Sequence, residues 1–221
     1  MKRFVAGALF LLAVSPTAWA DVGILLKAGT LGAGLDVSKG ISESLGLRLQ
    51  ANAFSYEDDF TESDVDYSAD LKLESAGLLL DWHPLSGAFR VSLGAYWNGN
   101  KASAVGRPTG GTYVINGQPY TSAEIGSLNG QIDFESVAPY FGIGFASAPK
   151  AGRGMTFSFD LGVLYQGEPN VGLTAVCGPA VLPPQCAQLQ SDVAAEQASL
   201  QEDLSDYKFH PVVSFGIGYR F

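Results

Sequence analysis

Hydrophobic and polar residues alternate with a period of two along much of the chain. From residue 208 to 221 the odd positions are mainly aromatic or aliphatic, and the even positions are mainly small or charged. Successive side chains of a β-strand point to opposite faces, so this pattern predicts a strand with one apolar face. The same alternation predicts seven strands, at residues 25–37, 45–52, 67–80, 89–98, 132–145, 155–165 and 209–221.

This pattern fits a membrane barrel better than a soluble β-sandwich, although a sandwich also alternates. Phe89, Trp97 and Tyr165 lie near strand ends, as the aromatic girdles of a membrane barrel require. Glycines and charges of both signs on the other face suit a narrow polar lumen. The strands are also longer than the usual five or six residues. We therefore predict an all-β fold, an antiparallel transmembrane β-barrel.

The first twenty residues predict export. Lys2 and Arg3 precede an apolar run that ends at Ala18-Trp19-Ala20, which is typical of a secretory signal peptide cleaved before Asp21. Residues 21–221 then form one barrel domain. The chain has 13 Lys and Arg against 22 Asp and Glu, and loss of the signal makes it more acidic. Such a charge argues against nucleic acid as a partner.

The chain ends in an alternating aromatic strand with Tyr219 and Phe221. It resembles the C-terminal strand by which the barrel assembly machinery recognises bacterial outer-membrane barrels. Together with residues 27–32, 71–84 and 157–162, this end resembles a group of small, largely uncharacterised proteobacterial outer-membrane β-barrel proteins. The resemblance implies a place among outer-membrane lipids, and it supplies no catalytic residues. No residue cluster indicates a cofactor or a metal.

Seven strands are clear, but bacterial single-chain barrels have an even number. We predict residues 170–177 as the eighth strand. Eight strands enclose an interior that side chains can fill. With both termini in the periplasm, however, this assignment places the short turns at 38–43 and 83–87 outside the cell, where long loops are usual. The sides of the loops therefore stay open.

Two long connections stand out. In residues 101–131, Asn116-Gly117 between β-prone residues predicts a tight hairpin. In residues 178–206, residues 186–204 predict an amphipathic helix with the stripe Leu189, Val193, Leu200 and Leu204. This stripe either packs on the barrel mouth or its own loop, or contacts a partner or membrane surface. Cys177 and Cys186 predict a disulfide, as expected of an exported chain.

Charged side chains on the less apolar strand faces predict a salt-bridge network in the lumen, because an isolated charge there costs several kcal/mol. The predicted members are Arg48, Asp70, Lys72, Glu74, Arg90, Asp160, Lys208, His210 and Arg220. A filled lumen favours a structural or surface-interaction role. The alternative is a narrow channel for small solutes that pass the same charges.

An enzyme acting on lipid or peptide is the third class of function. His83 and His210 are the only histidines in the sequence. Ser214 is four residues from His210, about 13 Å along a strand, whereas a nucleophile and its base must lie about 3 Å apart. Asp160 could approach His210 from another strand. We therefore expect no enzyme activity.

Overall fold

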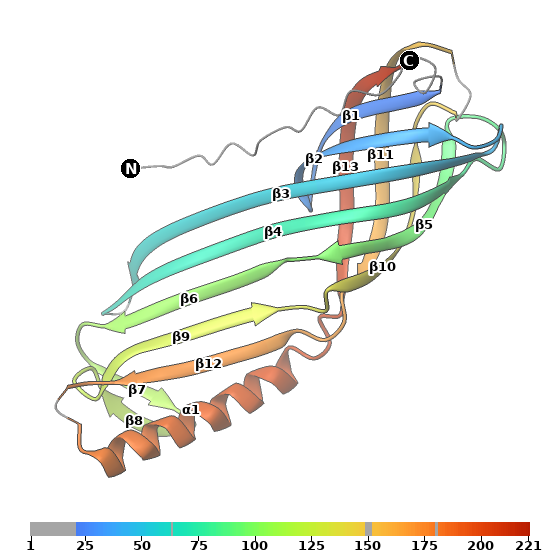
Figure 1. Ribbon diagram of the computed structural model, residues 1–221. Coiled ribbons are helices and arrows are strands. Elements are labelled where there is room, and N and C mark those ends of the chain that lie inside the picture. The colour runs from blue at the N-terminus through green and yellow to red at the C-terminus, as the bar shows by residue number, and fades with distance from the viewer. Residues whose placement is uncertain (1–20, 63, 149–151, 180) are drawn as a thin grey trace.

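The computed structural model describes residues 21–62, 64–148, 152–179 and 181–221, and the predicted signal peptide lies outside them (Figure 1). The described residues form thirteen strands and one helix. The elements are β1 (Val22–Gly29), β2 (Gly32–Gly40), β3 (Leu45–Glu62), β4 (Val65–Trp82), β5 (Phe89–Asn98), β6 (Lys101–Pro108), β7 (Thr112–Ile115), β8 (Gln118–Thr121), β9 (Ile125–Asp133), β10 (Val137–Phe145), β11 (Gly154–Tyr165), β12 (Asn170–Cys177), α1 (Pro183–Asp203) and β13 (Phe209–Arg220).

Eight antiparallel strands form a closed ring. Their order is β4, β3, β2, β1, β13, β11, β10 and β5, and β5 pairs again with β4. The first and last strands of the chain are neighbours, with Gly23 opposite Arg220. Because the ring is closed, its strands have no free edge within the membrane. Unpaired backbone N–H and C=O groups would be unfavourable in the lipid core, where no water can bind them. The predicted antiparallel barrel and its eight strands are confirmed.

Three predicted strands were assigned wrongly. Residues 25–37 form both β1 and β2, joined by a turn at Thr30 and Leu31, and Gly32 there has a φ of +98°. The lipid-facing positions change from even (Leu26, Ala28) to odd (Leu35, Val37) across this turn, but the sequence there contains no strong turn signal and therefore predicts one strand. The predicted eighth strand, Asn170–Cys177, is a strand (β12), but it lies outside the ring. Residues 132–145 likewise divide between β9 and β10, which are separated by a short connection at residues 134–136.

The corrected strands resolve the conflict over orientation. The start of β1 and the end of β13 lie at the same end of the barrel as the turns at residues 41–44 and 83–88 (Figure 1). Two long excursions, from β5 to β10 and from β11 to β13, leave the opposite end. Because short turns of such barrels normally face the periplasm, we expect both excursions to lie outside the cell.

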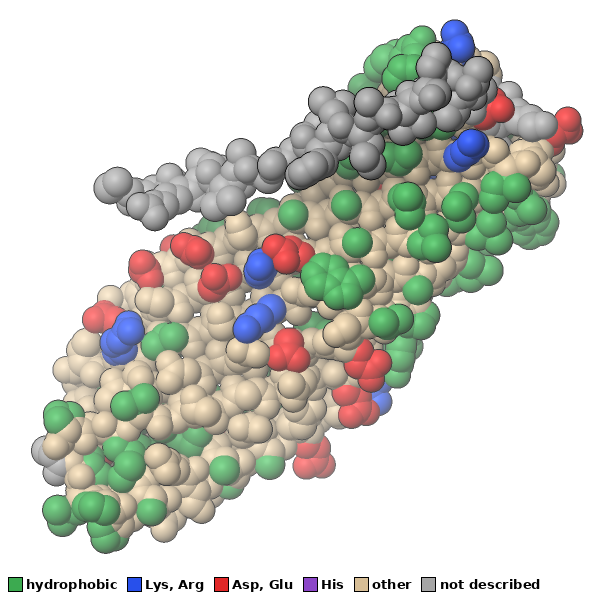
Figure 2. Space-filling model, in the orientation of Figure 1, with side chains coloured by type: hydrophobic (Ala, Val, Ile, Leu, Met, Phe, Trp, Pro, Cys, Tyr) green, Lys and Arg blue, Asp and Glu red, His purple; other side chains and the backbone are tan. Residues whose placement is uncertain are grey.

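The outer face of the barrel is a hydrophobic belt. Side chains such as Leu49, Leu78, Phe157 and Ile217 are exposed there, and Figure 2 shows hydrophobic side chains gathered over the barrel end of the molecule. Aromatic residues lie at both ends of this belt: Trp82, Phe89, Phe145, Tyr219 and Phe221 near the termini, and Trp97, Tyr165 and Phe209 at the other end. Within the described residues, no helix is long and apolar enough to span a membrane.

The sheet continues beyond the ring as an extension. Strands β3 and β4 each have 18 residues, and the outer part of β4 pairs with β6, which is followed by β9 and β12. Residues 101–131, predicted as a long connection, therefore contain β6, β7, β8 and most of β9. The predicted hairpin at Asn116-Gly117 joins β7 to β8, and both residues have positive φ.

Helix α1 lies along β12 at one edge of this extension (Figure 1). Leu189 and Val193 pack against Ile115, Tyr120 and Ile125, so half of the predicted stripe packs on the adjacent hairpin and sheet. The side-chain oxygens of Gln201 and Gln197 accept hydrogen bonds from the backbone N–H groups of Val171 and Leu173. These bonds pair two of the backbone N–H groups on the free edge of β12. They thereby make this edge less available for pairing with another strand.

Cys177, at the end of β12, is disulfide-bonded to Cys186 in the first turns of α1, with 5.7 Å between their Cα atoms. Chain-entropy reasoning gives a loop of this length about 2–3 kcal/mol of stabilisation. We expect the double variant Cys177→Ser, Cys186→Ser to loosen α1 by about this amount, measured as faster amide exchange in the helix. The heat-modifiable gel shift of the barrel should persist, and its loss would contradict a local role.

Asp192 anchors α1 to the hairpin. Its carboxylate accepts hydrogen bonds from the hydroxyl of Tyr120 and the amides of Gln188 and Asn116, at 2.5, 3.2 and 3.2 Å. These bonds, first that of Tyr120, hold the pKa of Asp192 below its ordinary value. Because the pKa of Asp192 is lower in the folded protein than in the unfolded chain, its ionised carboxylate stabilises docking of α1 at pH values above the unfolded-state pKa. This stabilisation is lost as the pH falls through the folded-state pKa. We therefore expect helix amide protection to decrease in acid, and Asp192→Asn to remove most of that pH dependence.

Candidate functional site

A layer of six charged side chains crosses the barrel lumen in the half nearer the termini. Three are basic and three acidic, so the layer is neutral, and six different strands contribute them. They are Lys27 (β1), Asp36 (β2), Arg48 (β3), Asp81 (β4), Arg90 (β5) and Asp160 (β11), and all are buried. The barrel interior therefore contains a compact ionic core.

Arg48 lies at the centre of this layer. Its Nη1 is 3.3 Å from Oδ2 of Asp36 and 3.2 Å from Oδ2 of Asp160. Its Nη2 is 3.0 Å from Oδ1 of Asp81 and also donates to the Ser92 hydroxyl at 3.1 Å. One guanidinium thus joins three carboxylates, which suits its fork of five donors.

The other two cations complete the network. Nζ of Lys27 lies 2.8 Å from Asp160 and 3.3 Å from Asp36. The Arg90 guanidinium lies 2.7 Å from Asp160 and 3.3 Å from Asp81. Because each charge has at least two opposite partners, the layer offsets the cost of burying ions in a low dielectric. The cavity bordered by this layer measures about 20 Å³, room for about one water molecule.

A hydrophobic layer closes the other half of the lumen. It consists of Leu31, Leu79, Tyr96, Ala138, Tyr140, Leu164 and Val212. The rings of Tyr96 and Tyr140 meet edge to face, with centroids 5.5 Å apart, and the Tyr96 hydroxyl donates to Gln50. Apolar atoms therefore stand between the ionic layer and the cell exterior.

Glycines on facing strands make room for the two tyrosines. A Cβ at Gly77 would lie 2.5 Å from the ring of Tyr96, and a Cβ at Gly162 would lie 2.5 Å from the hydroxyl of Tyr140. Distances this short cannot be accommodated without displacement of the ring. The glycine-rich inner face is thus filled by aromatic side chains and is not an open path.

Of the nine charges predicted for the lumen, the structure brings Arg48, Arg90 and Asp160 together. Arg220 is buried nearer the termini and borders the small cavity. His210 is half-buried near Thr30, at the other end of the barrel and outside the ionic layer. Lys208 lies just before β13 and pairs with Glu168 at 2.8 Å.

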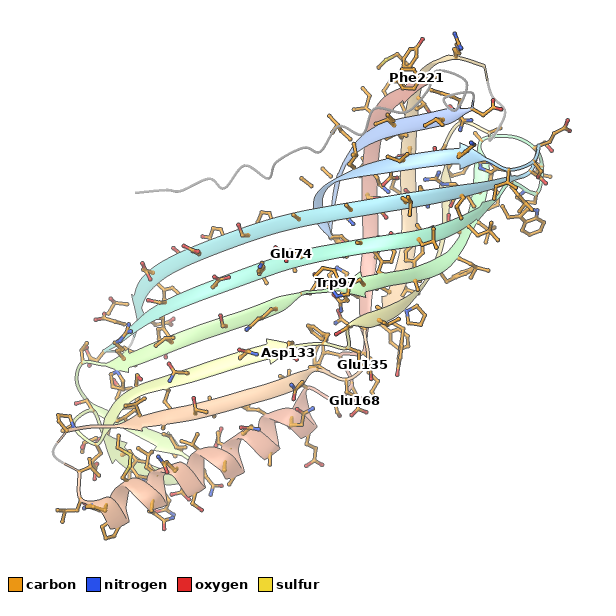
Figure 3. All side chains as sticks on the ribbon, in the orientation of Figure 1. Glu74, Trp97, Asp133, Glu135, Glu168 and Phe221 are labelled. Atoms are coloured by element: carbon orange, nitrogen blue, oxygen red, sulfur yellow. A yellow bond between two sulfur atoms is a disulfide. The ribbon has the colours of Figure 1, made fainter. Side chains whose placement is uncertain are left out.

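The predictions for Asp70, Lys72 and Glu74 were wrong. These residues lie on the outer face of β4, where Lys72 and Glu74 pair at 3.1 Å with exposed fractions of 51% and 40% (Figure 3). The outer face of β4 changes from apolar in the barrel to polar in the extension. Within the membrane the outer face is apolar and faces lipid, whereas above it the outer face meets water and is polar.

Sequence reasoning missed Lys27, Asp36 and Asp81. Each is a single charge between apolar neighbours that face outward: Leu26 and Ala28, Leu35 and Val37, and Leu80 and Trp82. A lysine on the lipid face costs about 2–4 kcal/mol at the midplane, and an aspartate costs less but is still unfavourable. Placing every isolated strand charge inside would have identified all three residues.

The groups considered for catalysis are held in other arrangements. Both carboxylate oxygens of Asp160 are bound by Lys27, Arg48 and Arg90. Nδ1 of His83 lies 2.8 Å from the carbonyl oxygen of Gly87, within a short turn.

The chain matches no protein-family model and no curated protein sequence. It is similar to two solved structures from Acinetobacter baumannii. CarO superposes with a TM-score of 0.57 at 24% identity, over 90% of this chain and 97% of CarO. CarO2 superposes with a TM-score of 0.56 at 21% identity, over 90% and 98% of the two chains. These similarities support the fold, a barrel with an outer extension.

Proposed function

We propose that this chain, a bacterial outer-membrane β-barrel with a CarO-like fold, is a closed barrel that presents its extension to partners outside the cell. The observation that carries the proposal is the filling of the lumen by two successive layers, one ionic and one apolar. A solute would have to displace Arg48 and its carboxylates and then the rings of Tyr96 and Tyr140. The extension, in contrast, offers exposed surface.

The larger hollows of the described residues also lie outside the lumen. One, of about 860 Å³, is on the lipid face around Phe157 and Phe215, and another, of about 550 Å³, is on the lipid face around Leu49 and Trp97. A third, of about 380 Å³, lies in the extension between Leu71, Leu173 and Leu200. Their positions favour contact with lipid or with a partner over transport through the barrel.

Planar-bilayer recording of the purified, refolded protein tests the closed state. We expect no stepwise conductance above that of protein-free bilayers, with an open porin prepared in the same detergent as the positive control. Reproducible channels whose ion selectivity changes in Arg90→Gln would contradict the proposal. They would support the competing function, a narrow channel past the ionic layer.

Assembly through the C-terminal strand is part of the same proposal. Tyr219 and Phe221 face outward at the end of the barrel, with ring centroids 5.1 Å apart (Figure 3). We expect Phe221→Ala to reduce the folded protein recovered from cell outer membranes several-fold, because the assembly machinery loses its aromatic recognition residue. Refolding of the same variant in detergent should be nearly unchanged. An equal loss in both settings would indicate a purely structural role.

A further inference from the structure

The outer part of β3 has a free edge. Residues 54–62 pair with β4 on one side. On the other side, β2 begins opposite Ala53, and among the described residues no strand pairs with residues 54–62 there. The Ala53 carbonyl faces Gly32 of β2, 2.7 Å from the position of a Cβ there. The β3–β4 register is unshifted, so backbone groups alternate regularly along the strand. The N–H and C=O groups of Ser55, Glu57, Asp59 and Thr61 therefore point to the open side.

The two edges of the extension differ. At β12 the edge is covered by α1, whose glutamines bind its backbone N–H groups. At β3 the protein places no helix or strand on the edge in the described residues (Figure 1). An exposed edge of about nine residues is roughly 30 Å long, enough to template an added strand.

The side chains along this edge alternate in chemistry. Phe54, Tyr56 and Phe60 lie on the inner face and are 44%, 55% and 43% exposed, and the same face carries Asp58 and, at the end of the strand, Glu62. Glu57 and Asp59 lie on the outer face and are exposed. An added strand would thus place one set of side chains against the three aromatic rings and Asp58, and the other set against Glu57 and Asp59.

An apolar groove continues from the inner face of this edge. Its volume is about 380 Å³, and its lining includes Tyr56, Leu71, Ala104, Ile132, Leu200 and Leu204. The floor is formed by small residues of β6 and β9, and α1 forms the far wall. Apolar side chains of a strand docked on β3 would point toward this groove.

We propose that the free edge of β3 binds an extended peptide segment of a partner protein, in which Lys or Arg alternates with aromatic or aliphatic residues. The added strand would gain main-chain hydrogen bonds from the edge and specificity from alternate side chains. Charge complementarity selects a cationic segment, because Glu57, Asp58, Asp59 and Glu62 all lie on this strand. Two copies of this chain paired edge to edge would place these carboxylates against each other, which is destabilising.

This inference names a partner class for the extension and so rests on the proposed function. Binding is measured by fluorescence anisotropy on the full-length mature protein in detergent, with a nine-residue peptide in which Lys alternates with Val and Phe. The control peptide has the same composition with its lysines grouped together. We expect saturable binding of the alternating peptide, at least about tenfold tighter than the control, because only the alternating peptide satisfies both faces of the edge.

Two variants separate charge from backbone. Glu57→Gln with Asp59→Asn should raise the Kd about 3- to 10-fold, since cross-strand charge pairs contribute roughly 0.2–1 kcal/mol each. Glu57→Pro removes an N–H that faces the open side and spares the β3–β4 ladder, so it should weaken binding while the barrel stays folded. The matched control, Glu202→Gln with Asp203→Asn on exposed positions of α1, should leave the Kd unchanged.

Amide hydrogen exchange gives the decisive readout. Bound peptide should slow exchange at Ser55, Glu57, Asp59 and Thr61, the amides that face the open side. Binding without this protection, equal binding of both peptides, or no binding would overturn the inference. None of these outcomes changes the conductance of the barrel, so failure here is distinguishable from failure of the closed-barrel proposal.

Discussion

Arg48→Ala is expected to lower the free energy of unfolding by about 3–5 kcal/mol, the usual cost of removing one partner from a buried ion network. The substitution leaves Asp36, Asp81 and Asp160 buried with only Lys27 and Arg90 between them. The layer then carries an uncompensated negative charge in a region sealed from water. Most of the expected destabilisation comes from this uncompensated buried carboxylate charge, and the lost hydrogen bonds add to it.

The measurement is reversible urea unfolding of the refolded protein in detergent or lipid, followed by tryptophan fluorescence and by the heat-modifiable gel shift. Lys72→Ala is the matched control, because Lys72 pairs with Glu74 on an exposed surface. Exposed pairs contribute about 0–1 kcal/mol. If Arg48→Ala cost no more than Lys72→Ala, the ionic layer would not stabilise the barrel as described.

Tyr96→Ala is expected to destabilise the barrel by about 3–5 kcal/mol through the cavity that it leaves. Tyr96 is 1% exposed, packs against Tyr140 and fills the space above Gly77. Glycine and strand backbone on the opposite side cannot collapse into the void, so the full cavity cost remains.

Leu93→Ala provides the comparison for Tyr96→Ala, since Leu93 lies on the same strand and faces lipid. Lipid chains fill the space that the smaller side chain leaves, so we expect a loss of only about 2 kcal/mol, near the transfer cost of the removed carbon atoms at about 0.8 kcal/mol each. Equal losses in the two variants would mean that the interior is not tightly packed around Tyr96.

The fold was largely predictable from the sequence because lipid imposes a simple pattern. Strands such as β5, β11 and β13 alternate between lipid-facing apolar residues and small or polar inner residues along their whole length. Prediction failed at residues 25–37, where the lipid-facing positions change from even to odd across a short turn. The turn at Thr30 and Leu31 contains no Asn, Asp or Pro, so β1 and β2 read as one strand, and β12 was taken as the missing member of the ring.

The ionic layer was predicted only in part, for a related reason. Arg48, Arg90 and Asp160 lie in the parts of their strands that stay within the membrane, so the rule that polar side chains face inward holds for them. Strand β4 leaves the membrane, and its polar residues Asp70 and Lys72 face water instead. The carboxylates that contact Arg48 are determined by the order of the strands around the barrel. Asp160 and Arg48 lie on strands that are not adjacent, and they meet only because the ring closes.

The most direct test of the account is the accessibility of a single thiol inside the lumen. Val212→Cys places a small side chain in the apolar layer, and the native cysteines are disulfide-bonded. A water-soluble maleimide should leave this thiol unlabelled in the folded protein and label it after boiling, whereas Val114→Cys on the exposed hairpin should react at once. Rapid labelling of Val212→Cys in the unboiled, gel-shifted barrel would show that water enters the lumen and would contradict the filled interior.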